Sequence, residues 1–287
     1  MPDAASLPPF RLLAQKPPDI DCIRKPDGTV YLKQRHEPGD RPRSVPHALA
    51  LRAGMHPDRS WLKQRNPEND EWEAITYGEG LQRTRALAQA FLDMGAGPDA
   101  PVMILSGNSI ESALVMVAAM TNGAPAAPIS VPYSLMSTDF AKLKHCFGAV
   151  GPKVLFAAQL APFAPALNAL GDHGCSVISA DGANGAVSLQ DLLDTTVTPA
   201  VDEALDALTD DTIGKYLFTS GSTGMPKPVP TTQVAMCSMI AGVEGLRDDA
   251  RDPDYDPSVP DNVLAWLPWN HISGSKVNFN GALWNGA

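Results

Sequence analysis

The side chains best suited to chemistry lie in residues 216–232, Tyr-Leu-Phe-Thr-Ser-Gly-Ser-Thr-Gly-Met-Pro-Lys-Pro-Val-Pro-Thr-Thr. Gly221 and Gly224 let the backbone bend sharply and bring its N–H groups close to a ligand. Lys227 adds a positive charge. Four hydroxyls that can both donate and accept hydrogen bonds come from Thr219, Ser220, Ser222 and Thr223. Together these groups suit a polyphosphate.

The spacing of this loop differs from that of a Walker A loop. Walker A has Gly, four residues, then Gly-Lys-Ser/Thr. Counted from Gly221, both the second Gly and the Ser/Thr are replaced, by Pro226 and Pro228. A simpler interpretation, a Gly/Ser-rich surface turn beside a strand, stays open because turns favour these residues. Pro228 also lacks an N–H and has a fixed φ, which leaves its effect on phosphate binding open.

Length and charge bound the class of protein. The 287 residues allow a sizeable core, and the net charge of −10 argues against nonspecific binding to nucleic acid or anionic membranes. The four cysteines form no Cys-x-x-Cys pair, so no zinc or thioredoxin-like motif is indicated. Residues 1–9 lack a secretory signal, and the longest apolar run, residues 113–120, is too short to cross a bilayer. We therefore expect a cytoplasmic protein.

Strand and helix patterns alternate from about residue 75 to 245, which predicts an α/β fold with a mostly parallel sheet flanked by helices. Residues 101–105 and 126–129 are expected strands around a helix capped by Asn108. Another helix is expected to begin at Ser137 or Thr138. A capping or surface role is assigned to His145. The remaining expectations are a mostly loop-like segment with one short helix at 180–210, a strand at 263–268, and an extended N-terminal arm with a hairpin at Asp27-Gly28.

The string from Tyr216 to Lys227 resembles the phosphate-binding signature of the adenylate-forming enzymes, which include acyl-CoA synthetases, peptide-synthetase adenylation domains and luciferases. Residues 76–79 and 123–130 resemble further segments of that family. Residues 132–135 are similar to the feruloyl-CoA synthetase branch. The resemblance implies an N-terminal arm over residues 1–40, followed at 41–287 by the N-terminal part of the family's large domain.

The resemblance also implies an activity, an ATP-dependent acid:CoA ligase that forms an acyl-adenylate, with a hydroxycinnamic-type acid as the leading substrate. Mg²⁺ would assist, but no metal ligand is assigned in this chain. Partners would be the acid, ATP and CoA, and a homo-oligomer stays open. Lys227 would act in catalysis. His271 and Trp269 would border the acyl pocket. The β- and γ-phosphates would be held by Lys227 and by Thr219, Ser220, Gly221, Ser222, Thr223 and Gly224.

Later signatures of the family are not found in the sequence: a Tyr-Gly-x-Thr-Glu segment, a Thr-Gly-Asp segment and a C-terminal catalytic lysine. We therefore expect an N-terminal fragment that gives no ATP–pyrophosphate exchange alone. A non-catalytic nucleotide- or phosphate-binding module is the alternative from another class. A peptide-synthetase adenylation domain is disfavoured by the His271 segment and by the absence of a carrier domain.

Overall fold

The computed structural model describes residues 14–66, 69–219, 224–251, 256, 259 and 261–287. The chain divides into two compact units. The smaller contains residues 1–41 and 238–260, and the larger contains residues 42–237 and 261–287.

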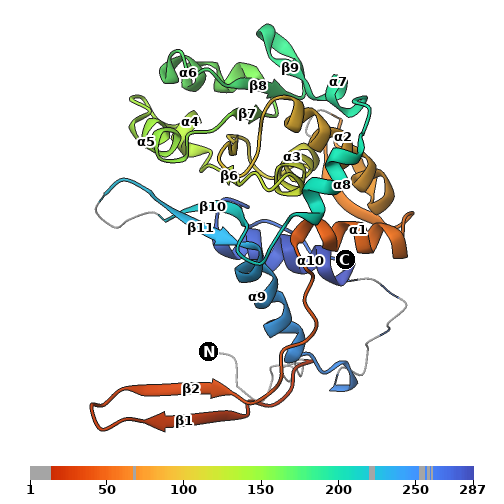
Figure 1. Ribbon diagram of the computed structural model, residues 1–287, viewed down its shortest axis with the longest axis vertical. Helices are drawn as coiled ribbons and strands as arrows, with labels where there is room; N and C mark the ends of the chain where they lie inside the picture. The colour runs from red at the N-terminus through yellow and green to blue at the C-terminus, as the bar shows by residue number, and fades with distance from the viewer. Residues whose placement is uncertain (1–13, 67–68, 220–223, 252–255, 257–258, 260) are drawn as a thin grey trace, which may run out of the picture. The chain divides into compact units, whose positions relative to one another are not determined.

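A seven-stranded sheet organises the larger unit, with strand order β11-β10-β6-β5-β7-β8-β9 (Figure 1). Only the β10–β11 pair is antiparallel; the other neighbouring strands are parallel. The predicted α/β fold is therefore confirmed. The strands are β5 Val102–Ile104, β6 Ala126–Pro128, β7 Val154–Ala157, β8 Ser176–Ser179, β9 Val187–Ser188, β10 Ile213–Thr219 and β11 Lys227–Thr232.

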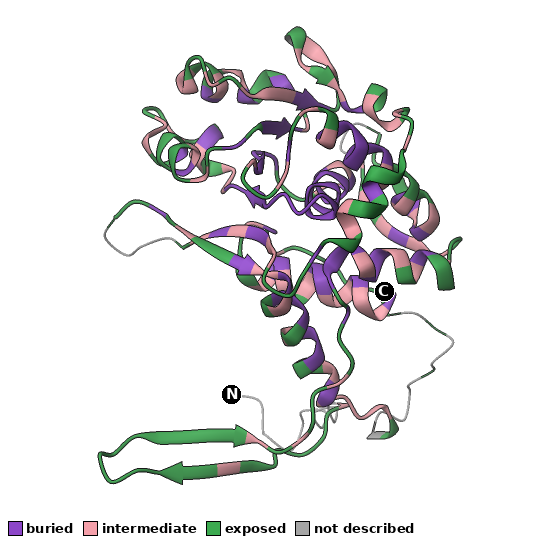
Figure 2. Ribbon diagram, viewed as in Figure 1, coloured by how far each residue is buried: buried purple, intermediate pink, exposed green. Residues whose placement is uncertain are grey.

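Helices cover both faces of this sheet because successive side chains of a strand point to opposite faces. In β5, Val102 and Ile104 join the core formed with α3, whereas Met103 joins the core formed with α5 and α6. The central strands β5, β6 and β7 are accordingly buried throughout, and so is α3 apart from the half-buried Glu111 (Figure 2). The helices are α1 Val45–Met55, α2 Tyr77–Asp93, α3 Ile110–Thr121, α4 Pro132–Leu135, α5 Ala141–Val150, α6 Leu160–Leu170, α7 Leu189–Leu193, α8 Pro199–Asp206, α9 Gln233–Gly245 and α10 Gly281–Asn285, with 3₁₀ turns η2 Ala183–Gly185 and η3 Asp249–Arg251 and a π-helix, η4 Ser273–Asn280.

Local capping sets where the first helices begin. Ser44 caps α1 by accepting from the His47 N–H, and Thr76 with Glu79 forms a complete capping box at α2. Between these helices, β3 (Ser60–Arg65) and β4 (Trp72–Thr76) form a separate antiparallel pair.

Several predicted elements were wrong. Ser109, not Asn108, caps α3, because the Asn108 side chain bonds elsewhere. The helix predicted from Ser137 or Thr138 is α5, which begins at Ala141, since the Ser137 hydroxyl accepts from the Phe140 N–H one turn before it. The segment at 180–210 holds a second helix, α8, capped by Thr198. Residues 263–268 form no strand, because no described segment pairs with their backbone.

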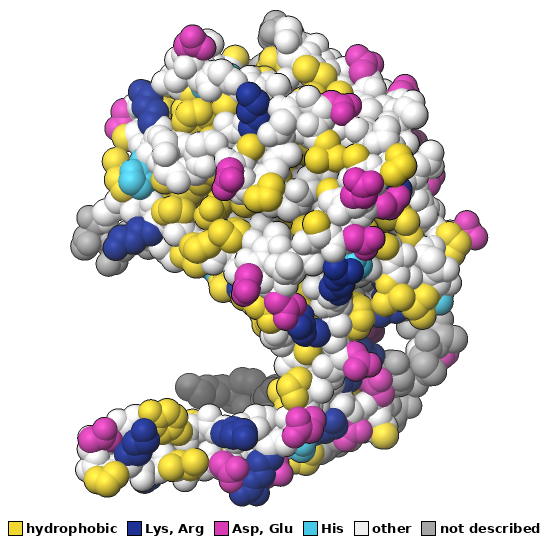
Figure 3. Space-filling model, viewed as in Figure 1, with side chains coloured by type: hydrophobic (Ala, Val, Ile, Leu, Met, Phe, Trp, Pro, Cys, Tyr) yellow, Lys and Arg dark blue, Asp and Glu magenta, His cyan; other side chains and the backbone are white. Residues whose placement is uncertain are grey.

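In the smaller unit, β1 (Ile20–Arg24) pairs with β2 (Val30–Gln34) as an antiparallel hairpin. Gly28, at φ +85°, supplies the left-handed backbone that its turn requires. Apolar side chains lie on the surface of this hairpin among charged ones (Figure 3). Across the described residues, no helix has the length and apolar character needed to cross a membrane.

Candidate functional site

The carboxyl ends of β5, β6 and β10 meet at one edge of the sheet because these strands are parallel. The next two strands of the sheet along the chain, β6 and β7, lie on opposite sides of β5, so the strand order reverses at β5. Ligands of α/β folds bind at such reversal points. Residues 105–108 follow β5, and the glycine-rich loop follows β10. With two strand spacings between them, the ends of β5 and β10 lie roughly 10 Å apart. One edge therefore carries both segments.

The glycine-rich loop connects the two strands of a hairpin rather than a strand and a helix. Thr219 of β10 pairs with Lys227 of β11 at the loop end of this hairpin, and both residues are exposed. Gly224 is also exposed. The hydroxyl and the ammonium thus flank the loop from both sides. Four of the predicted phosphate-binding residues lie outside the described residues: Ser220, Gly221, Ser222 and Thr223.

His145 contacts the end of this loop. Its Nε2 lies 2.9 Å from the Pro226 carbonyl oxygen. A carbonyl oxygen only accepts, so Nε2 carries the proton in this hydrogen bond. His145 is exposed, as expected for a surface residue, and its side chain also reaches from α5 to the residue before Lys227.

Pro228 and Pro230 fit the structure because β11 is the edge strand of the sheet. They pair with Phe218 and Tyr216, two residues apart on each strand. Residues two apart direct their backbone nitrogens to the same side of a strand, and proline is tolerated where that side faces away from the sheet. Pro228 therefore belongs to the strand that supports the loop.

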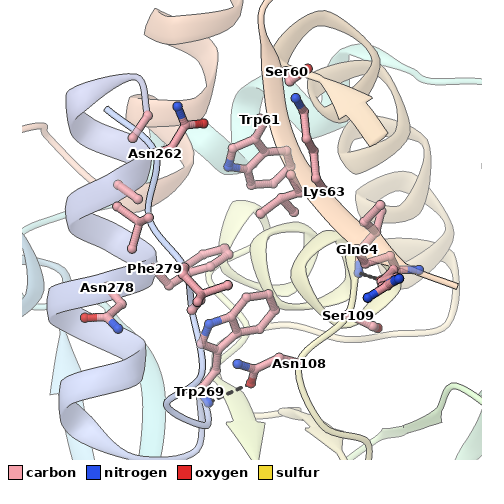
Figure 4. Close-up of a pocket in the computed structure, with 18 of the residues that line it drawn as sticks. Ser60, Trp61, Lys63, Gln64, Asn108, Ser109, Asn262, Trp269, Asn278 and Phe279 are labelled. Carbon is pink, nitrogen blue, oxygen red and sulfur yellow. Dashed lines mark hydrogen bonds between the residues drawn. The ribbon is translucent and has the colours of Figure 1, made fainter. Parts of the chain in front are cut away.

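A cavity of about 610 Å³ lies between β3, the start of α3 and η4 (Figure 4). Four aromatic residues line it, Trp61, Trp72, Trp269 and Phe279, and three of their rings are neighbours. The Phe279 ring centre lies 4.7 Å from that of Trp269 and 6.2 Å from that of Trp61. Trp269 therefore lines the cavity. His271 lies outside the lining, exposed, with its Nδ1 accepting from the Ser273 N–H at 3.4 Å.

Asn108 fastens the chain before η4 to the edge of the sheet. Its Nδ2 donates to the Leu267 carbonyl at 2.9 Å, and its Oδ1 accepts from the Trp269 N–H at 2.9 Å. The Asn108 side chain thus gives this backbone one donor and one acceptor, as the backbone of a neighbouring strand would. Asn108 and Trp269 also line a small crevice with Ile104 and Pro128, at the carboxyl ends of β5 and β6. Trp269 thus belongs to the crevice and to the aromatic cavity.

The same segment allows a stability prediction at Gly274. A Cβ added there would lie 2.3 Å from the Pro268 carbonyl oxygen and 2.8 Å from that of Leu267. We expect Gly274→Ala to destabilise the chain by about 1–3 kcal/mol in denaturant unfolding, because backbone atoms must move. The matched control is Gly281→Ala. That Cβ meets nothing within 4 Å at helical φ −64°, so we expect a gain of up to about 1 kcal/mol. Equal effects of the two changes would contradict the close approach at Gly274.

Lys215 is a residue whose role sequence analysis missed. It lies in β10 with no exposed surface, and its Nζ donates to Ser275 Oγ at 2.8 Å and to Asn280 Oδ1 at 3.2 Å. Burial, with Lys276 nearby as a smaller cause, lowers the pKa of Lys215 to about 7. The available signal was its position two residues before Leu217, on one face of an apolar strand.

Comparison with known proteins places the chain in a family. The model of the AMP-binding enzyme family matches residues 49–287, which is most of the chain. With its mostly parallel sheet and the loop after β10, this protein belongs to the AMP-binding enzyme family.

Two relatives and one solved structure illustrate the similarity. A probable CoA ligase, CCL9, from Humulus lupulus is 26% identical over 228 residues, 74% of this chain and 40% of its own length. The hybrid PKS-NRPS synthetase pyvA from Aspergillus violaceofuscus is 26% identical over 196 residues, 65% of this chain and 5% of its own length. A fatty acyl-adenylate ligase from L. pneumophila, solved with acyl adenylate and pyrophosphate, has 18% identity and a TM-score of 0.62 over 85% of this chain and 38% of its own. The chain thus spans less than half the length of each.

Proposed function

We propose that the full-length protein is an ATP-dependent carboxylic acid:CoA ligase that works through an acyl-adenylate. Membership of the AMP-binding enzyme family and relatives named as CoA ligases support this reaction class. The observation that carries the proposal is the hairpin end at the carboxyl edge of the sheet, where Thr219 and Lys227 flank the glycine-rich loop.

In the proposed first half-reaction, a carboxylate oxygen of the acid attacks the α-phosphorus of ATP, and the bond to the β-phosphate oxygen breaks. Pyrophosphate leaves. Thr219, Ser220, Gly221, Ser222, Thr223, Gly224 and Lys227 are proposed to hold the β- and γ-phosphates. Lys227 offsets the charge that grows on the leaving group, which is positioning and electrostatic stabilisation rather than proton transfer.

In the proposed second half-reaction, the CoA thiolate attacks the acyl carbonyl and AMP departs. Mg²⁺ would neutralise further phosphate charge when bound. Among the described residues, no group of three or more His, Cys, Asp or Glu side chains is placed to hold a metal ion, so we assign no ligand for it.

For the acid, we propose an aromatic, hydroxycinnamic-type substrate. Support comes from three adjacent rings among those that line the cavity, Trp61, Trp269 and Phe279, since aromatic groups pack well against tilted ring faces. Cationic side chains from Lys63 and Arg65 also line it. We keep His271 as a proposed pocket residue of the full-length protein.

ATP–pyrophosphate exchange with a panel of acids tests this function. We expect the full-length protein to give exchange with cinnamate-type acids and at least tenfold less with acetate, because acetate has no ring to bury. Residues 1–287 alone are expected to give none. Exchange strongest with acetate or a long-chain fatty acid would overturn the aromatic assignment. Absence of exchange with every acid, beside intact binding of ATP, would favour a non-catalytic nucleotide-binding protein.

A further inference from the structure

The buried ammonium of Lys215 has neutral partners only, among the described residues. Its two acceptors, Ser275 and Asn280, have no exposed surface either. The titratable groups near it are Lys276 on η4 and the Cys237 thiol on α9. No carboxylate therefore offsets its burial. A methionine would fill similar space without a charge to desolvate, and such replacements are often neutral or stabilising. The stability of the core alone does not account for a lysine here.

The two acceptors face Lys215 because η4 is a π-helix. Ser275 and Asn280 are five residues apart, the spacing that i→i+5 hydrogen bonds place one above the other. On an α-helix the same two residues would point roughly 140° apart at 3.6 residues per turn. The hydrogen bonds from one Nζ therefore match the π-helical winding of η4.

The winding of η4 sets the position of Phe279, which forms part of the cavity wall. Phe279 lies on η4 one residue before Asn280, and the Lys215 Nζ lies 5.2 Å from the centre of its ring. The same ring packs against Trp269, with 4.7 Å between the ring centres. At its far end, β10 carries Thr219 on the same face as Lys215, about 13 Å further along the strand. One strand thus links the cavity wall to the start of the glycine-rich loop.

A bulge in β10 directs this lysine. The register with β11 shifts between Ile213 and Lys215, and Gly214 stands at the shift. Bulges re-aim side chains and occur often beside active sites. A Cβ added at Gly214 would lie 2.4 Å from Met236 Cε and 2.7 Å from Gln233 Nε2, so the ends of those two side chains would have to move. The direction of the Lys215 side chain is therefore built into the strand.

We infer that Lys215 is a positioning residue of the proposed adenylation site, which ties the π-helical cavity wall, through Ser275 and Asn280, to the strand that leads into the glycine-rich loop. The inference rests on the proposed function. In this role, Lys215 holds η4, the wall of the proposed acid-binding cavity, at a fixed distance from the phosphates of ATP.

Kinetics of Lys215→Met in the full-length protein test the assignment. In ATP–pyrophosphate exchange we expect KM for the acid to rise about tenfold or more, while KM for ATP changes less than twofold, because only the cavity wall loses its anchor. The control is Val177→Ala, which removes partly buried methyl groups in β8. A loss of folded protein alone lowers kcat and leaves both KM values unchanged. The same pattern in Lys215→Met would overturn the inference.

Hydrogen exchange separates this inference from the proposed function. In Lys215→Met, we expect amide exchange to accelerate about tenfold or more at residues 273–280, beyond any change in the Val177→Ala control. Uniform acceleration of amide exchange along the chain would contradict the inference that Lys215 anchors η4. If the wild-type protein gave no pyrophosphate exchange, the proposed function would fail, while this measurement would still decide whether Lys215 anchors η4.

A second variant keeps the test decisive if Lys215→Met does not fold. The triple change Lys215→Met, Ser275→Ala and Asn280→Leu leaves no buried acceptor without a donor, so we expect it to fold. The KM for the acid should remain raised, because apolar packing does not specify π-helical winding. A wild-type KM for the acid in this variant would overturn the inference.

Discussion

Replacing Lys227 by alanine in the full-length protein is expected to lower kcat for ATP–pyrophosphate exchange about 10²-fold or more. Lys227 stands at the end of the hairpin, exposed and paired with Thr219 across the mouth of the glycine-rich loop. A positive charge aimed at a departing pyrophosphate acts mostly in the transition state, and removing one such donor costs 10² to 10³ in rate. The loss should therefore fall on kcat more than on KM for the acid.

Lys153→Ala is the matched control for that experiment. Lys153 is also exposed, but it directly precedes β7 and so lies at the amino edge of the parallel sheet, away from the loop. We expect this variant to keep wild-type exchange within about twofold. If Lys227→Ala behaved like Lys153→Ala, the role proposed for Lys227 would be wrong.

The second large effect concerns pH and Lys215. Burial lowers its pKa to about 7 in the folded chain, below the usual lysine value of 10.5 in the unfolded chain. Between these values the unfolded state binds more protons, so the free energy of unfolding must rise with pH. The slope from this one group approaches 1.4 kcal/mol per pH unit. It falls to zero below about pH 7, because Lys215 is then protonated in both the folded and the unfolded chain.

Urea unfolding at pH 7.0, 7.5, 8.0 and 8.5 measures this slope. We expect it to be present in the wild-type chain and reduced by up to about 1 kcal/mol per pH unit in Lys215→Met, since other titrating groups cancel in the difference. Lys153→Met serves as the control and should keep the wild-type slope. Parallel stability curves for wild type and Lys215→Met would show that the ammonium is not buried as described.

Sequence patterns predicted the α/β fold because its elements carry their own start signals. Ser44 and the Thr76–Glu79 pair satisfy free N–H groups at helix starts, so their helices follow from local chemistry. The edge strand β11 was missed because its two prolines argue against a strand in isolation. They are tolerated only because nothing lies beyond that edge in the sheet order of the described residues.

Non-local contacts explain the failures at the site. Asn108 has the residue type and position of a helix cap, yet it bonds to residues about 160 positions further along the chain. The π-helical winding of η4 depends on packing against Lys215, which no local pattern encodes. The apolar run at 263–268 resembles a strand, but a strand needs a neighbouring backbone to pair with.

Oxygen transfer tests the central claim, acyl-adenylate formation, most directly. The full-length protein would be supplied with ATP, CoA and a cinnamate-type acid carrying ¹⁸O in its carboxylate, and the products analysed by mass spectrometry. Attack of that carboxylate on the α-phosphorus predicts one ¹⁸O atom in AMP and none in pyrophosphate. Formation of ADP with ¹⁸O in inorganic phosphate would contradict the account, because the acid would then have been activated at the terminal phosphate.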